Sequence, residues 1–123
     1  MKSLGVVLLQ GNPAVAQSLS ASLSEKFRSV RCVGSLEELR NSVAKHRAEV
    51  VILDIENTSI HAVQELSREF PRACIVCTHR LADEQMWMAV LDAGAADVCP
   101  SFDTPGILNA ALRNVAGSRS AVA

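Results

Sequence analysis

The sequence lacks the features that mark several broad classes of protein. Its apolar runs have the length of strands, far below the roughly 18 residues that a membrane-spanning helix needs. Twelve Lys and Arg against thirteen Asp and Glu give a net charge of −1, without the basic excess of an autonomous nucleic-acid-binding domain. No charged-then-apolar leader opens the chain. We therefore expect a cytoplasmic protein that contacts neither membrane nor nucleic acid directly.

Three kinds of side chain are scarce. The chain has no tyrosine, and aromatic residues make up only 3% of it. The three lysines are Lys2, Lys26 and Lys45, so none lies in the second half of the chain. No acidic residue precedes Glu25. These gaps restrict where a phosphate or metal site that needs lysine or carboxylate groups can be built.

The four cysteines do not indicate a metal or redox site. Cys74 and Cys77 form a C-x-x-C pair, but residues 73–77 are typical of a buried strand. Residues three apart on a strand point to opposite faces, so the two sulfur atoms diverge. No second C-x-x-C or H-x-x-x-H supplies further zinc ligands. We predict reduced core thiols, with Cys32 and Cys99 included.

Apolar segments of strand length alternate with amphipathic helical patterns along the chain. With 123 residues, 49% of them hydrophobic, the chain suits one domain and is too short for two. The predicted strands cover residues 4–9, 29–33, 50–53, 74–77 and 96–99. The alternation predicts five βα units around a parallel sheet, an α/β fold. We assign residues 1–116 to the domain and 117–123 to a flexible tail or the start of a linker.

The helices between these strands have distinct starting signals. We predict helix caps at Asn12, at Ser35 in a Ser-x-x-Glu capping box and at Asp83. Thr104 with Pro105 starts the last helix, and Gly94 ends the fourth. Four-residue spacing places Val15, Leu19, Leu23 and Phe27 on one helical face, and Ile60, Val63, Leu66 and Phe70 share another.

Polar residues follow several strands at the point where each one ends. In open parallel sheets, sites lie at these carboxyl ends, where strand order reverses. Asp54 follows the most apolar strand and is either a helix-capping aspartate or a carboxylate that accepts a phosphoryl group. The Thr78 hydroxyl, at the end of the next strand, is placed to donate a hydrogen bond to an oxygen at Asp54. The two residues together favour the phosphoryl-acceptor interpretation.

The order and spacing of these segments resemble the CheY-like receiver domains of two-component response regulators. The matching segments cover nearly the whole chain: residues 6–9 with Asn12-Pro13, then 50–55, 75–78 and 91–97. The resemblance implies a flavodoxin-like doubly wound sheet with strand order 2-1-3-4-5. It also implies that Asp54 is the phosphoacceptor and that Thr78 contacts the phosphoryl group.

Departures from the family pattern concentrate at this site. The family usually ends its first strand with two acidic residues that hold Mg²⁺, and here these are Gln10 and Gly11. Asp54 alone remains as a metal ligand, so we expect weak Mg²⁺ binding and no other cofactor. The family lysine after the fifth strand is missing, and Ser101 lies in the matching stretch. The switch aromatic, whose match lies near Val98, is missing as well. The double change Gln10→Asp with Gly11→Asp is predicted to restore Mg²⁺ binding.

Three side chains beside the site each have two interpretations. His79, where the family usually has a small residue, is either a surface-loop histidine or a lid or ligand-contact group beside the aspartate. Glu56 is either a solvated loop residue or a charge that turns into the pocket. Arg80 either faces solvent or supplies a cation near the pocket.

Three functions are compatible with these residues. The first is a degenerate receiver, or pseudo-receiver, that is not an enzyme and acts mainly through protein–protein interaction, with weakened or absent Mg²⁺-dependent phosphorylation. The second is a receiver phosphorylated on Asp54 by a histidine kinase. The third is a flavodoxin-like enzyme or small-ligand binder, against which the chain lacks a glycine-rich phosphate loop after its first strand.

The expected partners are proteins: a histidine kinase, or an output domain that is fused or separate. In the family, the fourth helix, fifth strand and fifth helix often form a dimer or effector surface. The matching residues are 86–91 and 107–115, and Trp87 is the candidate contact residue.

Overall fold

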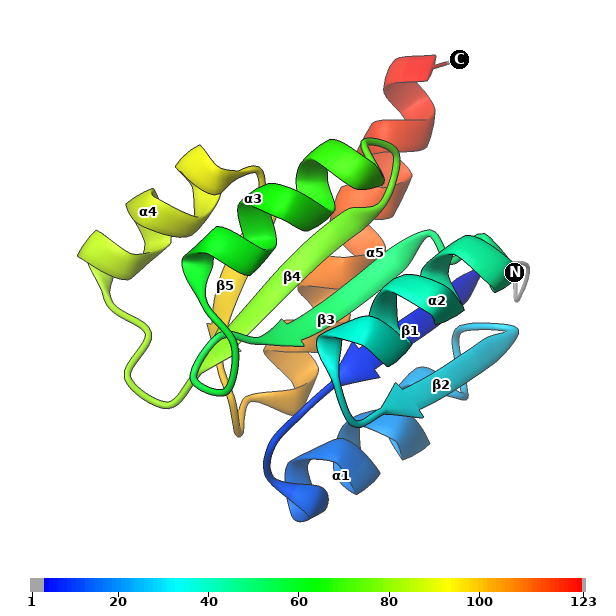
Figure 1. The fold of residues 1–123 in the computed structure, drawn as a ribbon. Coiled ribbons are helices and arrows are strands. Elements are labelled where there is room, and N and C mark those ends of the chain that lie inside the picture. Colours follow the sequence, from blue (N-terminus) through cyan, green and yellow to red (C-terminus); the bar gives the residue numbers. More distant parts are fainter. Residues whose placement is uncertain (1–3, 123) are drawn as a thin grey trace.

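Five parallel strands form one twisted sheet in the computed structural model, which describes residues 4–122 and side chains as far as Asn114. The strands are β1 (Gly5–Leu9), β2 (Ser29–Val33), β3 (Val50–Asp54), β4 (Cys74–His79) and β5 (Asp97–Pro100). Their order is β2-β1-β3-β4-β5, so the predicted doubly wound, flavodoxin-like α/β topology is confirmed (Figure 1).

Five helices connect and cover the strands. They are α1 (Pro13–Leu23), α2 (Leu36–His46), α3 (Ile60–Glu69), α4 (Glu84–Ala93) and α5 (Thr104–Val122). The caps predicted at Asn12, Ser35 and Asp83 are confirmed, because each side chain accepts a hydrogen bond from a backbone N–H of the first turn. Gly94 ends α4 in the left-handed region, with φ of 113°.

The alternation of side chains along the strands builds two cores, one on each face of the sheet. Val6 and Leu8 of β1 pack with α1 and α5, whereas Val7 and Leu9 pack with α2, α3 and α4. Figure 1 shows α1 and α5 behind the sheet and the other three helices in front of it. Cys77 belongs to the front core and Cys74 packs against the rear one, so the predicted divergence of the two thiols is confirmed.

Two sequence predictions about the helices are wrong. α1 ends at Leu23, and Phe27 lies beyond it, although its ring is 2% exposed and belongs to the same core. Ile60, the first residue of α3, is 39% exposed and is not part of the buried face that contains Val63 and Leu66. α5 continues through Val122, so the backbone of residues 117–122 is helical, and their assignment as a tail or the start of a linker stays a prediction.

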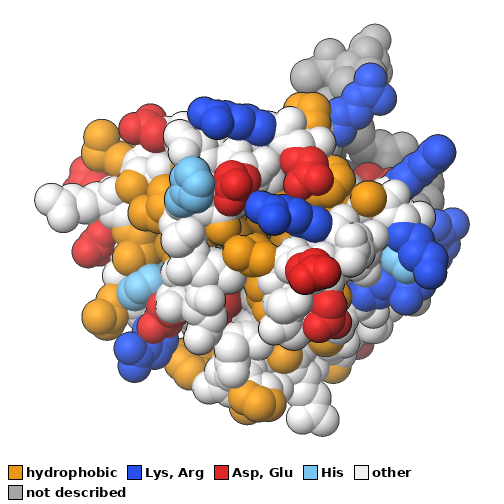
Figure 2. Space-filling model, in the orientation of Figure 1, with side chains coloured by type: hydrophobic (Ala, Val, Ile, Leu, Met, Phe, Trp, Pro, Cys, Tyr) orange, Lys and Arg blue, Asp and Glu red, His pale blue; other side chains and the backbone are white. Residues whose placement is uncertain are grey.

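Within the described residues, no helix combines the length and the apolar character needed to cross a bilayer. Positive and negative side chains are interspersed on the face formed by α2 and α3 (Figure 2). Arg40 of α2 lies between Glu65 and Glu69 of α3, with nitrogen–oxygen distances of 3.3 Å to each.

Candidate functional site

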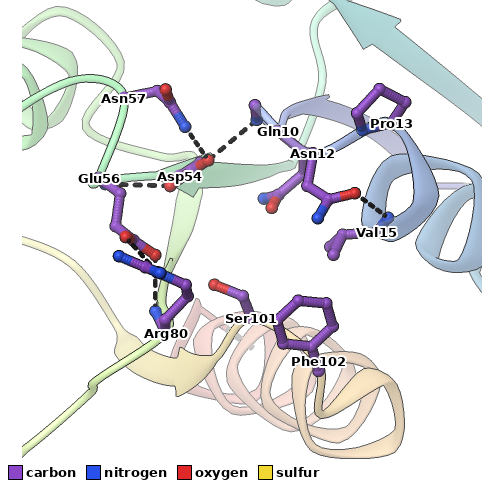
Figure 3. Close-up of a pocket in the computed structure, with 11 residues that line it drawn as sticks. Gln10, Asn12, Pro13, Val15, Asp54, Glu56, Asn57, Arg80, Ser101 and Phe102 are labelled. Atoms are coloured by element: carbon purple, nitrogen blue, oxygen red, sulfur yellow. Dashed lines mark hydrogen bonds and ion pairs between the residues drawn. The ribbon is translucent and has the colours of Figure 1, made fainter.

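The carboxyl ends of the strands meet at one edge of the sheet and enclose a pocket of about 390 Å³. Parallel pairing sets Asp54 beside Thr78, and it sets Leu9, which precedes Gln10, beside Leu53. The pocket is lined by residues from the ends of β1, β3 and β4, the start of α1 and the loop after β5: Gln10, Gly11, Asn12, Pro13, Val15, Asp54, Glu56, Asn57, Arg80, Ser101 and Phe102 (Figure 3). The predicted clustering of polar residues at this edge is therefore observed.

The carboxylate of Asp54 is buried, with 5% of the residue exposed, and it accepts three hydrogen bonds from neutral groups. Oδ2 accepts from the backbone N–H of Gly11 at 2.9 Å and from Nδ2 of Asn57 at 2.6 Å. Oδ1 accepts from the backbone N–H of Glu56 at 3.0 Å. Figure 3 shows the Asn57 amide pointing directly at the carboxylate. The negative charge of Asp54 is thus stabilised by N–H donors from two loops.

The loop between β3 and α3 adopts this shape because its polar side chains bond back to the chain. The Asp54 carboxylate accepts from the N–H two residues later, an Asx-type turn. The Thr58 hydroxyl donates to the Asp54 carbonyl at 2.8 Å, and Ser59 caps α3. These contacts bring Asn57 over the carboxylate. Sequence reasoning missed Asn57, although an asparagine three residues after an aspartate, with a glycine across the pocket, was an available signal.

Gly11 is the residue that leaves room for this amide. A Cβ atom built at Gly11 would collide with the carboxamide of Asn57. The backbone N–H of Gly11 also points at Asp54. The absence of a side chain at position 11 therefore lets the Asn57 amide and the Gly11 backbone N–H both reach Asp54.

Thr78 is fully buried, and its hydroxyl bonds to Gln10 rather than to Asp54. Nε2 of Gln10 donates to Oγ1 of Thr78 at 3.0 Å, and the hydroxyl lies 3.3 Å from Oε1 of Gln10. The predicted Thr78–Asp54 hydrogen bond is therefore wrong, because the side-chain amide of Gln10 offers the hydroxyl both a donor and an acceptor.

Glu56 turns away from Asp54 and forms a two-point contact with Arg80. Its Oε1 accepts from the backbone N–H of Arg80, and its Oε2 accepts from Nε of the same residue, both at 2.8 Å. These hydrogen bonds lower the pKa of Glu56 from its usual value, and the one from the backbone N–H of Arg80 has the largest effect. Glu56 therefore does not replace the missing charge at Asp54, and Arg80, although it lines the pocket, has its charge balanced by Glu56.

His79 and Ser101 take different positions relative to the pocket. The ring of His79 is held by the loop after β4, where Nδ1 accepts from the backbone N–H of Leu81 at 2.9 Å. It is not a pocket-lining residue, so the lid interpretation is wrong. Ser101 is buried and lines the pocket, as predicted from its place after β5. Phe102, which sequence reasoning did not single out, also lines the pocket, and 67% of it is exposed.

The residues of this pocket do not fit a Mg²⁺ ion. Magnesium needs several hard oxygen ligands in octahedral geometry. Here Oδ2 of Asp54 faces two N–H groups, whose partial positive charges oppose a cation, and the side-chain amide of Gln10 bonds to Thr78. Among the side chains that the structure describes, no three from His, Cys, Asp and Glu come together as a metal site.

Comparison with solved structures identifies the architecture. A CheY-like protein (tadZ) from Pseudomonas aeruginosa PAO1 is 24% identical, with 94% of each chain covered and a TM-score of 0.74. A response regulator from Thermotoga maritima is 15% identical, with 93% of this chain and 98% of that chain covered and a TM-score of 0.83. This is the receiver fold.

A third similar structure is the N-terminal signal receiver domain of a two-component response regulator from Bacteroides fragilis. It is 23% identical, with 92% of this chain and 98% of that chain covered and a TM-score of 0.81. No family model and no curated protein matches the sequence. The fold expected from the resemblance is confirmed, and what the receiver fold does in this chain has to be argued from its own pocket.

Proposed function

We propose that this chain is a receiver-type signalling module that acts through protein–protein interaction and does not catalyse a reaction of its own. In this degenerate receiver, Asp54 stays unphosphorylated in the presence of Mg²⁺ and a phosphodonor. The observation that carries the proposal is the set of three neutral N–H donors on the Asp54 carboxylate, from Gly11, Glu56 and Asn57.

Electrostatics supports this proposal. Phosphoryl transfer to a carboxylate concentrates negative charge at the acceptor, which has to be balanced by cations or by aligned donors. The chain has no lysine after Lys45, and the nearby Arg80 pairs with Glu56. The three donors at Asp54 already bond to the carboxylate itself. Little is left in the pocket to stabilise an incoming phosphoryl group.

A second candidate function is a phosphorylatable receiver, which two observations favour. Oδ1 of Asp54 accepts one hydrogen bond, whereas Oδ2 accepts two, so Oδ1 keeps a lone pair for attack on a phosphodonor. Thr78 pairs with Asp54 in the register of β3 and β4, so it lies next to Asp54 on the neighbouring strand. The partner in that case is a histidine kinase.

Intact-mass measurement separates the two candidates. The protein is incubated with Mg²⁺ and acetyl phosphate, together with Asp54→Asn and the exposed control Asp92→Asn. Fluorescence of Trp87, the only tryptophan, checks that each variant is folded. We expect the mass of all three proteins to stay unchanged. A phosphoryl adduct on the wild type and on Asp92→Asn that is lost in Asp54→Asn overturns the first proposal and supports the second.

We further propose that the exposed side of α4 is the surface that contacts a protein partner. Trp87 and Met88 of α4 are 46% and 58% exposed, and Leu81, in the loop before α4, is 71% exposed. Hydrophobic side chains gather over α4 at the left of Figure 2. An exposed tryptophan in such a patch is a common binding hot spot. The candidate partners are a second copy of the chain, a kinase and a fused or separate output domain.

Sedimentation velocity over a range of concentrations tests the first of these partners. Trp87→Ala is compared with Phe102→Ala, a control that also removes an exposed aromatic ring but at the pocket. A dimer that is lost only in Trp87→Ala supports the α4 surface. A monomer at every concentration excludes the homodimer and leaves the other two partners. We also propose a cytoplasmic location, which is supported by the presence of all four cysteines as free thiols.

A further inference from the structure

We infer that Asn57 is an internal substitute for a cation at Asp54, and that Asn57 and Gly11 form an interlocked pair that keeps the site closed to divalent ions. This inference rests on the proposed function and explains how the pocket is held in one state. Neither Gly11 nor Asn57 is charged, so the charge pattern of the sequence does not point to either of them.

The position of the Asn57 amide is the first observation. Its contact with Oδ2 of Asp54, at 2.6 Å, is the shortest of the three at this carboxylate. A magnesium ion bound to the same oxygen would lie about 2.0–2.1 Å from it, in the space that the amide nitrogen and its hydrogen atoms fill. The amide and an ion on that side of Oδ2 therefore exclude each other.

The second observation is that the Asn57 side chain occupies the space that a Cβ atom at position 11 would need. A Cβ atom at position 11 would collide with the Asn57 carboxamide, so any other residue there has to displace the amide. The loop cannot move away easily, because the Thr58 hydroxyl bonds to the Asp54 carbonyl and Glu56 bonds to Arg80. A residue with a Cβ atom at position 11 therefore displaces the Asn57 side chain rather than the loop backbone.

This interlock changes the expectation for restoring a metal site. Gln10→Asp with Gly11→Asp returns two carboxylates to the end of β1, but the new side chain at position 11 meets the Asn57 carboxamide. Two acidic residues alone are therefore a poor metal site. Removal of the Asn57 side chain is the additional change that opens Oδ2 of Asp54 to an ion.

A double-mutant cycle in urea measures the interlock without any metal. The four proteins are the wild type, Gly11→Ala, Asn57→Ala and the double variant, and Gly34→Ala is the control because its new Cβ makes only ordinary contact. We expect Gly11→Ala to lower the unfolding midpoint when Asn57 is present and to leave it nearly unchanged in Asn57→Ala. Equal shifts in the two backgrounds overturn the inference.

Calorimetric titration with Mg²⁺ tests the consequence for ion binding. The proteins are the wild type, Gln10→Asp/Gly11→Asp, and the same double variant with Asn57→Ala. Because the Asn57 amide and an ion on the same side of Oδ2 exclude each other, we expect the triple variant to bind at least about tenfold more tightly than the double variant, which is about 1.4 kcal/mol. Equal affinities, or no binding by either folded variant, overturn the inference.

These outcomes are distinguishable from failure of the proposed function. An Asp54-dependent phosphoryl adduct on the wild type contradicts the proposed function whatever the double-mutant cycle shows. An additive cycle contradicts the interlock even if the wild type carries no adduct. The two experiments use different readouts, a mass and an unfolding midpoint, on the same folded chain.

Discussion

Replacement of Asp54 by alanine should destabilise this protein, because three N–H donors hold its carboxylate. Asp54→Ala leaves the N–H groups of Gly11, Glu56 and Asn57 without their acceptor. Hydrogen bonds to a charged group contribute about 1.5–3 kcal/mol each, which sets an upper bound of about 4.5–9 kcal/mol for three. Water that enters the pocket solvates the freed N–H groups, so we expect a loss of about 2–4 kcal/mol.

Urea unfolding followed by Trp87 fluorescence and far-ultraviolet circular dichroism measures this loss. At ordinary urea sensitivities the midpoint falls by about 1–2 M, with an unchanged slope. Asp54→Asn keeps one acceptor oxygen and should lie between the wild type and Asp54→Ala. The control Asp92→Asn changes an exposed carboxylate on α4 and should stay within about 0.5 kcal/mol of the wild type. An Asp54→Ala protein as stable as the wild type, or more stable, refutes the reasoning.

Three further predictions concern other parts of the molecule. Burial raises the pKa of the Cys74, Cys77 and Cys99 thiols to about 11, 12 and 11, so only exposed Cys32 should react with iodoacetamide in the native protein. Intact mass should show one adduct, and a second adduct contradicts the burial of these thiols. Phe27→Ala should cost about 3–5 kcal/mol in urea unfolding, and a loss below about 1 kcal/mol would show that the ring is not in the core. Because the pKa of Glu56 is lowered, its contact with Arg80 stabilises the fold near neutral pH and is lost on acidification. The stability difference between the wild type and Glu56→Gln should therefore shrink as the pH falls below the usual pKa of glutamate and vanish once it passes the lowered pKa of Glu56, and a constant difference contradicts it.

The fold could be predicted from the sequence because its signals are local. The apolar strands, the caps at Asn12 and Asp83 and the stop at Gly94 each depend on neighbouring residues in the chain. The errors arose where local spacing was extended too far. Phe27 keeps the four-residue spacing of α1 but lies after its end, and it is buried by tertiary packing rather than by the helix.

The candidate site was predicted in position but not in its contacts. Asp54 and Thr78 were placed together because parallel strands end at one edge of the sheet. Some of the groups that bond to them lie far away in the chain: the backbone N–H of Gly11 is 43 residues from Asp54, and the side chain of Gln10 is 68 residues from Thr78. The missing acids at positions 10 and 11 signalled that the site was altered. They did not show that the amide of Asn57 fills the space.

The Asp54 pocket surrounds a buried carboxylate with neutral donors. Two loops provide these donors, and Glu56 and Arg80 connect the loop after β3 to the loop after β4. Under the proposed function, the surface of the domain rather than this pocket carries the signal to a partner.

The central claim is that the donors at Asp54 exclude Mg²⁺, and amide NMR of the wild-type protein tests it most directly. Proton–nitrogen spectra are recorded during a titration with millimolar MgCl₂, with NaCl of equal ionic strength as the control. The signals to follow are the backbone amides of Gly11 and Glu56 and the side-chain amide of Asn57, the three donors to the carboxylate. We predict no shift beyond the NaCl control. A saturable, Mg²⁺-specific shift of these three signals would contradict the claim.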